Sequence, residues 1–334
     1  MSELVAEVVV VLYRSLRTAE AEVMQFLNLA ATDGRVRWTF VDNDEDGSDA
    51  KVLAPLVAER SNVELVRRAD NPGFAAACNT RGLSTDAPWL VLLNPDLTVS
   101  ATAFAALVRS LTAAADDTDA LAFSQQTGGL HHAGVAFTPA GWFVDRPLAG
   151  PRGRLGRRAT VYRSLGGAGR VLGPSGGAAA YRTAAFRELG GFHEPYFAWG
   201  EDADLALRMY LEGRRTETVQ LALAHQGGHS VSGRGVSRRA SLLVRNRILL
   251  AARLYTAPQT AAFGAFLALV LAAKVPVLLR ARTLGSTLAG VRAGLRAAPS
   301  ARRAYRGRRL GVRDHSSMRR KVATGRGFTG APSQ

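Results

Sequence analysis

Cysteine and lysine are scarce in this chain. Cys78 is the one cysteine among 334 residues, so neither an internal disulfide nor a zinc site built from several cysteines can form. Lysine provides 3 of the 43 basic residues, which makes the basic surface nearly all arginine. Because 47% of the residues are apolar and 21% are charged, the composition excludes a disordered or fibrous class for most of the length.

Acidic residues are almost absent from the last third of the chain. From residue 231 onwards, 21 basic residues accompany a single acid, Asp314, whereas the first 230 residues contain 22 basic and 26 acidic residues. The formal charge of +16 therefore arises from a cationic C-terminal part joined to a mildly acidic body. Such a part attracts polyanions: an anionic lipid surface, a nucleic acid or a phosphorylated substrate.

The N-terminus lacks the pattern of an export signal. Residues 1–7 include acids rather than a basic segment, and the apolar run 8–12 is too short for the hydrophobic part of a signal peptide. We interpret this β-branched run as a buried first strand.

Short apolar runs alternate with segments of helical spacing through the first hundred residues. The predicted strands are 8–12, 38–41, 63–66 and 89–93, and the predicted helices are 19–31, 50–60 and 75–83. This alternation predicts an α/β fold with a mostly parallel open sheet flanked by helices. Ligands of such sheets bind at the carboxyl ends of the strands.

The pattern is less regular after residue 126. Residues 127–170 are rich in Gly, Pro and Arg and are expected to form a hairpin or a mobile loop. A glycine-rich turn then leads into a strand within 171–182, residues 201–213 form a helix, and 219–224 form a last short strand that ends at His225.

A 13-residue apolar run, 261–273, is interrupted by Lys274 and Pro276. Since a bilayer span needs about 20 mostly apolar residues, this segment favours a helix in the membrane plane or one packed on the body, with a true span as the third option. We expect three regions: a catalytic domain (1–250), a basic helical membrane-associating extension (251–314) and a disordered tail (315–334).

Four polar clusters follow predicted strands or precede a predicted helix. An acid in such a place is often only a helix cap, so each cluster alone is a weak signal. The clusters are Asp42-Asn43, Asn71-Pro72-Gly73-Phe74 with Asn79, Asn94-Pro95-Asp96, and Gly200-Glu201-Asp202-Ala203-Asp204.

In their order, these clusters resemble the motif series of the family 2 glycosyltransferases over about residues 6–250. The matching segments are NPGFAAACNTRG (71–82), WLVLLNPDLTV (89–99), GGFHEPYFAWGEDADLALRMYLEG (190–213), AHQGGHS (224–230) and RNR (245–247). The resemblance implies a GT-A-type fold and an inverting enzyme that uses nucleotide-sugar donors. The NPD and GEDADL forms are most similar to the rhamnosyltransferase branch, which builds cell-wall linkers and surface polysaccharides.

The resemblance implies a divalent cation, Mg²⁺ or Mn²⁺, that neutralises the diphosphate leaving group. Asp96 matches the second acid of the family's metal-binding triplet, while Asn94 stands where the first acid usually does. His225 matches the histidine that completes the metal shell, and its alternative role is that of a capping or packed histidine. With one carboxylate at this point, the cation would depend on the diphosphate and on water.

The resemblance also assigns the catalytic base. Asp202 matches the base that takes the proton of the acceptor hydroxyl, and the adjacent Glu201 would raise its pKa. Trp199 is expected to stack on a sugar ring, with a core aromatic as its alternative role. Asp204 is expected to contact the acceptor, or else to orient the loop, for example through an arginine. The alternative is that Glu201, Asp202 and Asp204 only cap a helix.

The nucleotide sugar is expected across the first half of the sheet. Gly73 would allow close approach of the backbone to the nucleotide, and Arg81 would reach the diphosphate. The family's usual acidic pattern after the second strand is shifted here, which leaves the finer base contacts open. The expected donor-binding residues are Tyr13, Asp42, Asn43, Asn71, Gly73, Phe74, Asn79, Arg81, Asn94, Asp96 and Gly177.

The sequence thus predicts a hexosyl-transferring enzyme, with rhamnose as the expected sugar and a lipid-linked or polysaccharide acceptor in cell-envelope glycan synthesis. Its expected location is peripheral, at the inner face of the cytoplasmic membrane, with an anionic membrane surface as partner. The alternatives are a nucleic-acid-binding protein acting through the arginine-rich C-terminus and an inactive scaffold. Nucleic acid is disfavoured because the arginine-rich tail has few aromatic rings on which bases could stack: Tyr305 and Phe328 are the aromatic residues after 300.

Overall fold

The computed structural model describes residues 3–127, 130–138, 140–147, 171–225, 234–311 and 314. Its strands are β1 (Ala6–Leu12), β2 (Val36–Asp42), β3 (Val63–Arg67), β4 (Trp89–Leu93), β5 (Leu97–Thr98), β6 (Ala120–Thr127), β7 (Leu130–Phe137), β8 (Phe143–Pro147), β9 (Ala178–Arg182) and β10 (Thr216–His225). Its helices are α1 (Glu20–Ala30), α2 (Ser48–Ala58), α3 (Phe74–Gly82), α4 (Ala101–Thr112), α6 (Thr183–Glu188), α7 (Glu201–Leu211), α8 (Arg234–Leu254), α9 (Ala257–Arg280) and α10 (Leu284–Arg303), with short 3₁₀ turns η1 (Ser15–Arg17) and η2 (Glu194–Tyr196).

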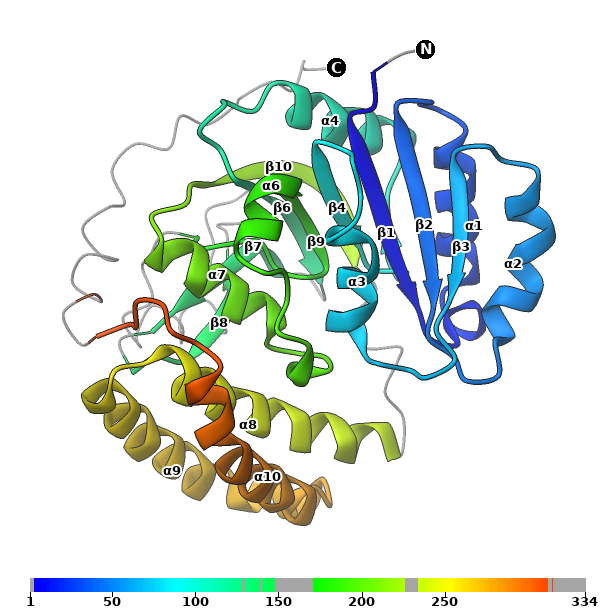
Figure 1. Cartoon of the computed structure of the whole chain (residues 1–334). Coiled ribbons are helices and arrows are strands. Elements are labelled where there is room, and N and C mark those ends of the chain that lie inside the picture. The colour runs from blue at the N-terminus through cyan, green and yellow to red at the C-terminus, as the bar shows by residue number, and fades with distance from the viewer. Residues whose placement is uncertain are drawn as a thin grey trace.

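One mixed sheet runs through the molecule in the order β3-β2-β1-β4-β9-β6-β10-β5, and β7 and β8 extend it from β6 (Figure 1). β1, β2, β3 and β4 are parallel, as are β6 and β10, whereas β9 runs antiparallel to both β4 and β6. The α/β class and the parallel first half that the sequence predicts are therefore confirmed.

The register brings the polar clusters to one edge of the sheet. Leu12, Asp42 and Arg67 are paired in neighbouring strands, so β1, β2 and β3 end side by side. Leu93 at the end of β4 pairs with Ala178 at the start of β9. The loops after β1, β2 and β4 and the turn before β9 therefore converge, as expected for a ligand-binding edge.

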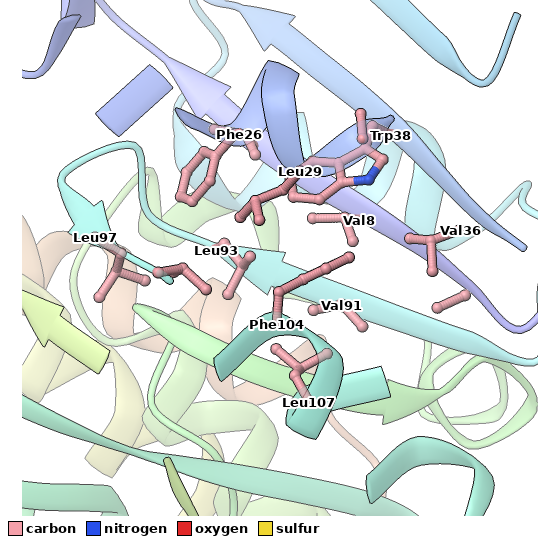
Figure 2. Packing of buried hydrophobic residues seen from close by; sticks show 14 of the residues in the cluster. Val8, Phe26, Leu29, Val36, Trp38, Val91, Leu93, Leu97, Phe104 and Leu107 are labelled. Carbon is pink, nitrogen blue, oxygen red and sulfur yellow. The ribbon is translucent and has the colours of Figure 1, made fainter. Parts of the chain in front are cut away.

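Helices bury both faces of this sheet. Val8, Val10 and Leu12 face α1, α2 and α4, while Val9 and Val11 face α3, α6 and α7, because successive residues of a strand point to opposite faces. The first core is centred on Trp38, whose ring lies 5.7 Å from Phe26 and 5.4 Å from Phe104 (Figure 2). Because both faces of the sheet are buried, the central strands are largely continuous apolar runs in the sequence.

A second core joins the C-terminal helices to the sheet domain. α8, α9 and α10 lie together below α7 and β8 in Figure 1, and their buried residues form one cluster with Leu207 and Leu211 of α7. Gly290 of α10 lies so close to α8 that an added Cβ would be 2.3 Å from the Ser241 carbonyl oxygen. The expected boundary at residue 250 falls inside α8.

The apolar segment is one continuous helix. α9 runs from Ala257 through Lys274 and Pro276 to Arg280, so neither residue ends it. It is long and apolar enough to cross a membrane by length and composition, and 11% of its most apolar window is buried. Phe263 and Leu267 pack against the body, while most of the helix faces outward.

Two further expectations concern irregular regions. The hairpin expected within 127–170 is present as β7 and β8, which are antiparallel. The disorder expected for 315–334, and His229 of the AHQGGHS segment, lie outside the described residues.

Candidate functional site: a carboxylate, a histidine–aspartate pair and the turn between them

The turn before β9 connects two of the predicted clusters. The Asn94 backbone N–H donates to the Gly177 carbonyl oxygen at 2.9 Å, and the Gly176 N–H donates to Asp202 Oδ2 at 3.0 Å. Asp202, at the start of α7, and the Asn94-Pro95-Asp96 turn therefore meet at the same sheet edge. Gly177 leaves no room for a side chain, because a Cβ there would lie 2.8 Å from Gln125 Oε1.

Asp202 is a partly buried carboxylate at this edge. Its Oδ1 also accepts a hydrogen bond from the Ala203 N–H at 2.7 Å. Burial raises its pKa to about 6, the Gly176 N–H opposes that rise, and the charge of Asp145 on β8 adds to it. A carboxylate with such a pKa is ionised at neutral pH yet is a stronger base than an exposed aspartate, as a general base requires.

Glu201 differs from its neighbour. It is 5% exposed, and its Oε2 has no hydrogen-bond partner in the described part of the chain. Burial, followed by the Asp202 charge, raises its pKa to about 8, so it holds a proton at neutral pH. The Asp202 charge therefore contributes to the raised pKa of Glu201. The raised pKa of Asp202 comes from burial and from the charge of Asp145.

The acceptor contact expected for Asp204 is wrong. Its fully buried side chain accepts hydrogen bonds from Arg208 Nε at 2.6 Å, Arg253 Nε at 2.9 Å and the Tyr196 hydroxyl at 3.1 Å. Burial would raise its pKa, but the two guanidinium groups outweigh burial and lower it. Asp204 orients this part of the fold through arginines, which is the other role considered for it.

Asp96 and His225 lie together because β5 pairs with the end of β10. The register places His225 opposite Leu97, next to Asp96, and His225 Nε2 is 2.9 Å from Asp96 Oδ1. Adjacent ligands of an octahedral cation are about 2.9 Å apart when each is roughly 2.0–2.1 Å from the metal. The pair thus fits a divalent cation that also takes diphosphate and water oxygens.

In the part of the chain that the structure describes, a larger ligand set does not form around this pair. Within the described residues, no group of three or more His, Cys, Asp or Glu side chains could hold a metal ion. This agrees with the asparagine at position 94, which replaces the family's first acid.

The loop after β2 is held by its own acids, so the base or ribose contact expected for Asp42 is wrong. Both Asp42 oxygens accept backbone N–H groups, from Asp44 at 2.9 Å and Ala50 at 2.8 Å, and the side chain is fully buried. Asn43 donates to the Gly73 carbonyl at 3.2 Å, while its buried Oδ1 has no partner among the described residues. Tyr13 is 45% exposed at the end of β1 and can still border a base.

The Asn71–Phe74 turn is shaped by a protein contact. Asn71 adopts a φ of 41° and donates to Glu45 Oε1 at 2.9 Å. Gly73 adopts a φ of 90°, and a Cβ there would lie 2.5 Å from the Phe197 carbonyl oxygen. The close approach that Gly73 allows is therefore made by Phe197 of this chain. Phe74 follows at the start of α3, where its ring is near Gly176.

The donor contacts expected for Asn79 and Arg81 are also wrong. Asn79 Nδ2 donates to the Phe192 carbonyl at 2.9 Å and its Oδ1 accepts the Phe192 N–H at 2.9 Å, which ties α3 to the segment before α7. Arg81 Nε donates to Glu7 Oε1 at 2.7 Å. Glu7 lies at the start of β1, at the opposite end from the site.

Three residues near the site were not predicted from the sequence. Gln125 of β6 packs against Gly177, and its buried Nε2 has no partner in the described ranges. Asp145 of β8 acts electrostatically on Asp202. Asn246 of α8 contacts the chain just before Glu201. Only Asn246 lies in a matched motif, RNR; nothing in the local sequence distinguishes the other two.

Comparisons with known proteins agree with this architecture. A family profile described as the N-terminal domain of galactosyltransferase matches residues 164–227. No curated protein sequence matches the chain. Among solved structures, mannosyltransferase PcManGT from Pyrobaculum calidifontis in complex with GDP-Man and Mn²⁺ has a TM-score of 0.51 at 17% identity, covering 90% of this chain and 88% of that one.

Two other structures are similar. S. aureus TarS 1-349 in complex with UDP-GlcNAc has a TM-score of 0.51 at 13% identity, covering 95% of this chain and 90% of that one. GalNAc-T7 with UDP, GalNAc and Mn²⁺ has a TM-score of 0.50 at 16% identity over 77% of this chain, which spans about half (49%) of that protein. The chain has a GT-A-type glycosyltransferase fold. The fold is thereby established, while the family 2 assignment and its rhamnosyltransferase branch stay predictions.

Proposed function

We propose that this protein is an inverting glycosyltransferase that moves a sugar from a nucleoside-diphosphate donor to an acceptor hydroxyl. One observation carries the proposal: the Asp202 carboxylate and the Asp96–His225 pair lie at one sheet edge, joined through Gly176 and Gly177. The fold and the galactosyltransferase profile support the same chemistry.

In this reaction, Asp202 removes the proton of the acceptor hydroxyl while that oxygen bonds to the anomeric carbon from the face opposite the diphosphate. The bond between the anomeric carbon and the diphosphate breaks, and the nucleoside diphosphate leaves with the electron pair. The configuration at the anomeric carbon is thereby inverted. Asp96 and His225 would hold Mg²⁺ or Mn²⁺, which supplies neutralising charge to the diphosphate when bound. Glu201 keeps its proton and leaves Asp202 as the base.

The donor sugar that we propose is rhamnose, and the acceptor is a lipid-linked or polysaccharide glycan of the cell envelope. This choice rests on the NPD and GEDADL forms of the two acidic motifs. Trp199 supports an acceptor next to Asp202, since its partly exposed ring lies three residues before the base, with Arg239 5.5 Å from the ring centre.

We also propose that the protein binds the inner face of the cytoplasmic membrane, with α9 lying in the membrane plane. Three large apolar side chains of α9 point to solvent: Leu269, Val277 and Leu279 are 68%, 62% and 57% exposed. The contacts of Trp142 with Phe263 and Phe266 hold the other side of the helix on the body, which favours an in-plane position over a span. An anionic leaflet would attract the surrounding arginines.

The test assays four purified proteins, wild type and three variants, against a panel of nucleotide sugars and a lipid-linked acceptor. Asp202→Asn should abolish transfer, because the amide cannot take the proton, while donor binding in a thermal-shift assay with Mn²⁺ survives. A donor at 100 times its dissociation constant should stabilise wild type and Asp202→Asn alike, by about 2.7 kcal/mol. Glu201→Gln should retain transfer, since Glu201 is already neutral.

Asp117→Asn, at an exposed carboxylate paired with Arg215, serves as the matched control and should behave as wild type. If Asp202→Asn transferred sugar at the wild-type rate, Asp202 would not be the catalytic base. A wild-type protein that neither binds nor transfers any sugar of the panel would contradict the function.

A further inference from the structure

The segment between η2 and α7 has an unusual backbone. Phe197 and Trp199 have φ values of 67° and 66°, and Gly200 has a φ of 126°. Side-chain-bearing residues rarely adopt such angles, and they persist only where the surroundings impose them. This segment, 197–200, leads directly into Glu201 and Asp202, so its conformation determines where the carboxylate of Asp202 lies.

One side chain of α8 holds this segment. Asn246 Nδ2 lies 3.0 Å from the Tyr196 carbonyl oxygen and 2.8 Å from those of Ala198 and Trp199. The side chain is fully buried, so water does not compete for these carbonyls. Arg245 Nη1 donates to Asn246 Oδ1 at 2.9 Å, which turns the amide so that its N–H groups face the segment.

The remaining carbonyl of this stretch is bound from the other side. The Ala75 N–H donates to the Phe197 carbonyl oxygen at 3.2 Å. Four consecutive carbonyls, from Tyr196 to Trp199, are thus bound by the Asn246 amide and by two backbone donors, the Ala75 N–H and the Ala198 N–H, the latter 2.8 Å from the Tyr196 carbonyl oxygen. A carboxylate or an apolar side chain at 246 has no N–H to offer, so asparagine provides a donor that neither aspartate nor leucine can replace.

We propose that Asn246 is a positioning residue for the transfer reaction: it fixes the 197–200 segment and thereby holds Asp202 against the Gly176 turn. The inference rests on the proposed function. It concerns a residue that touches neither Asp202 nor the Asp96–His225 pair, and it acts through the backbone.

Release of the segment should change both the place and the surroundings of Asp202. The titratable groups that interact electrostatically with Asp202 are Glu201 of α7, Asp145 of β8 and Tyr181 of β9. All are acidic, so none of them lowers the pKa of Asp202 as a cation would, and burial together with the Asp145 charge keeps that pKa raised. A looser segment admits water, which lowers that pKa towards the value of an ordinary aspartate.

The test measures kcat, KM for the donor, the pH profile of kcat and thermal unfolding in full-length variants. Asn246→Ala should lower kcat on the order of 10²-fold, the size expected for a misplacement of about 1 Å, with little change in KM. The acidic limb of its profile should move to lower pH. Asn246→Asp, which keeps the shape and loses the donor, should behave likewise, and Asn246→Ser, which keeps one donor, should be intermediate.

Leu250→Ala is the matched control, because Leu250 is equally buried in α8 but makes none of these hydrogen bonds. It should lower the unfolding temperature and leave the pH profile unchanged. Asn246 variants with the wild-type kcat and profile, or a Leu250→Ala variant that reproduces their loss, would overturn the inference. Absence of transfer by the wild-type protein would instead count against the proposed function.

Discussion

Adjacent carboxylates can have different roles because the fold surrounds each one differently. Asp202 receives two backbone N–H groups, Glu201 leaves one oxygen without a partner in the described residues, and Asp204 is neutralised by two arginines. These differences follow from which strand or helix lies opposite each side chain. Three acids within four residues are therefore expected to comprise a base, a neutral acid and a structural anchor.

Glu201→Gln should change how stability depends on pH. Since the pKa of Glu201 is raised from 4.5 to about 8 by folding, the native state holds a proton that the unfolded state releases. Stability should therefore fall as the pH rises from about 4.5 to about 8. Glutamine has no proton to lose, so the variant should be more stable than wild type at pH 9, with a smaller difference at pH 5.

Urea unfolding at the two pH values measures this effect, with the exposed Glu59→Gln as control. A Glu201→Gln protein that loses stability between pH 5 and pH 9 as steeply as wild type would show that Glu201 titrates normally.

At the scale of elements, the strands of the buried sheet were predictable, because residues 8–12 of β1 and all of β4 are unbroken apolar runs and each is followed by polar residues. α4 and β6 were not predicted, although both are well formed. In α4, alanine and threonine between the larger apolar residues make the helical periodicity weak. β6 ends in Ser-Gln-Gln-Thr, which is as polar as a loop.

The candidate site was predictable where a residue lies near the end of its own strand, as Asp96 and His225 do, or at the start of its own helix, as Asp202 does. Asn79 and Arg81 were misassigned because only the first residue of α3 lies near the site. Further along this helix, the Asn79 and Arg81 side chains bind Phe192 and Glu7, away from the site. Gln125 and Asn246 depend on contacts between distant segments, which a single sequence does not contain.

Gly290→Ala should weaken the contact between α10 and α8. A Cβ at position 290 would lie 2.3 Å from a backbone oxygen of Ser241, so one helix must move. Overpacking of this kind costs about 1–3 kcal/mol. Gly285→Ala, in the same helix with nothing within 4 Å of the added Cβ, is the control and should be neutral or slightly stabilising. Chemical unfolding measures both, and equal stability of the two variants would contradict the close packing.

At the scale of the whole molecule, charge and apolar surface are found in the same region. The part of the chain after residue 230 has 21 basic residues and one acid, which more than accounts for the formal charge of +16 of the whole chain, and α9 exposes large apolar side chains over much of its length. In water, such an exposed apolar helix is costly. On an anionic bilayer, the apolar side would be buried while Lys274, Arg280 and Arg282, all exposed, would meet lipid phosphates.

Replacing Leu269, Val277 and Leu279 together with glutamine should therefore reduce sedimentation with vesicles of phosphatidylglycerol and phosphatidylcholine, because less apolar area enters the membrane. Wild-type binding should be weaker on pure phosphatidylcholine and should fall with added salt, since the arginines lose their attraction to the surface. Val52→Gln, at an apolar residue of α2 that is 48% exposed, should pellet as wild type does. Alkaline carbonate should release the bound protein, because a helix lying in the plane is held less firmly than a span. A triple variant that pelleted as well as wild type would contradict the role of α9, and resistance to carbonate would indicate that α9 crosses the bilayer.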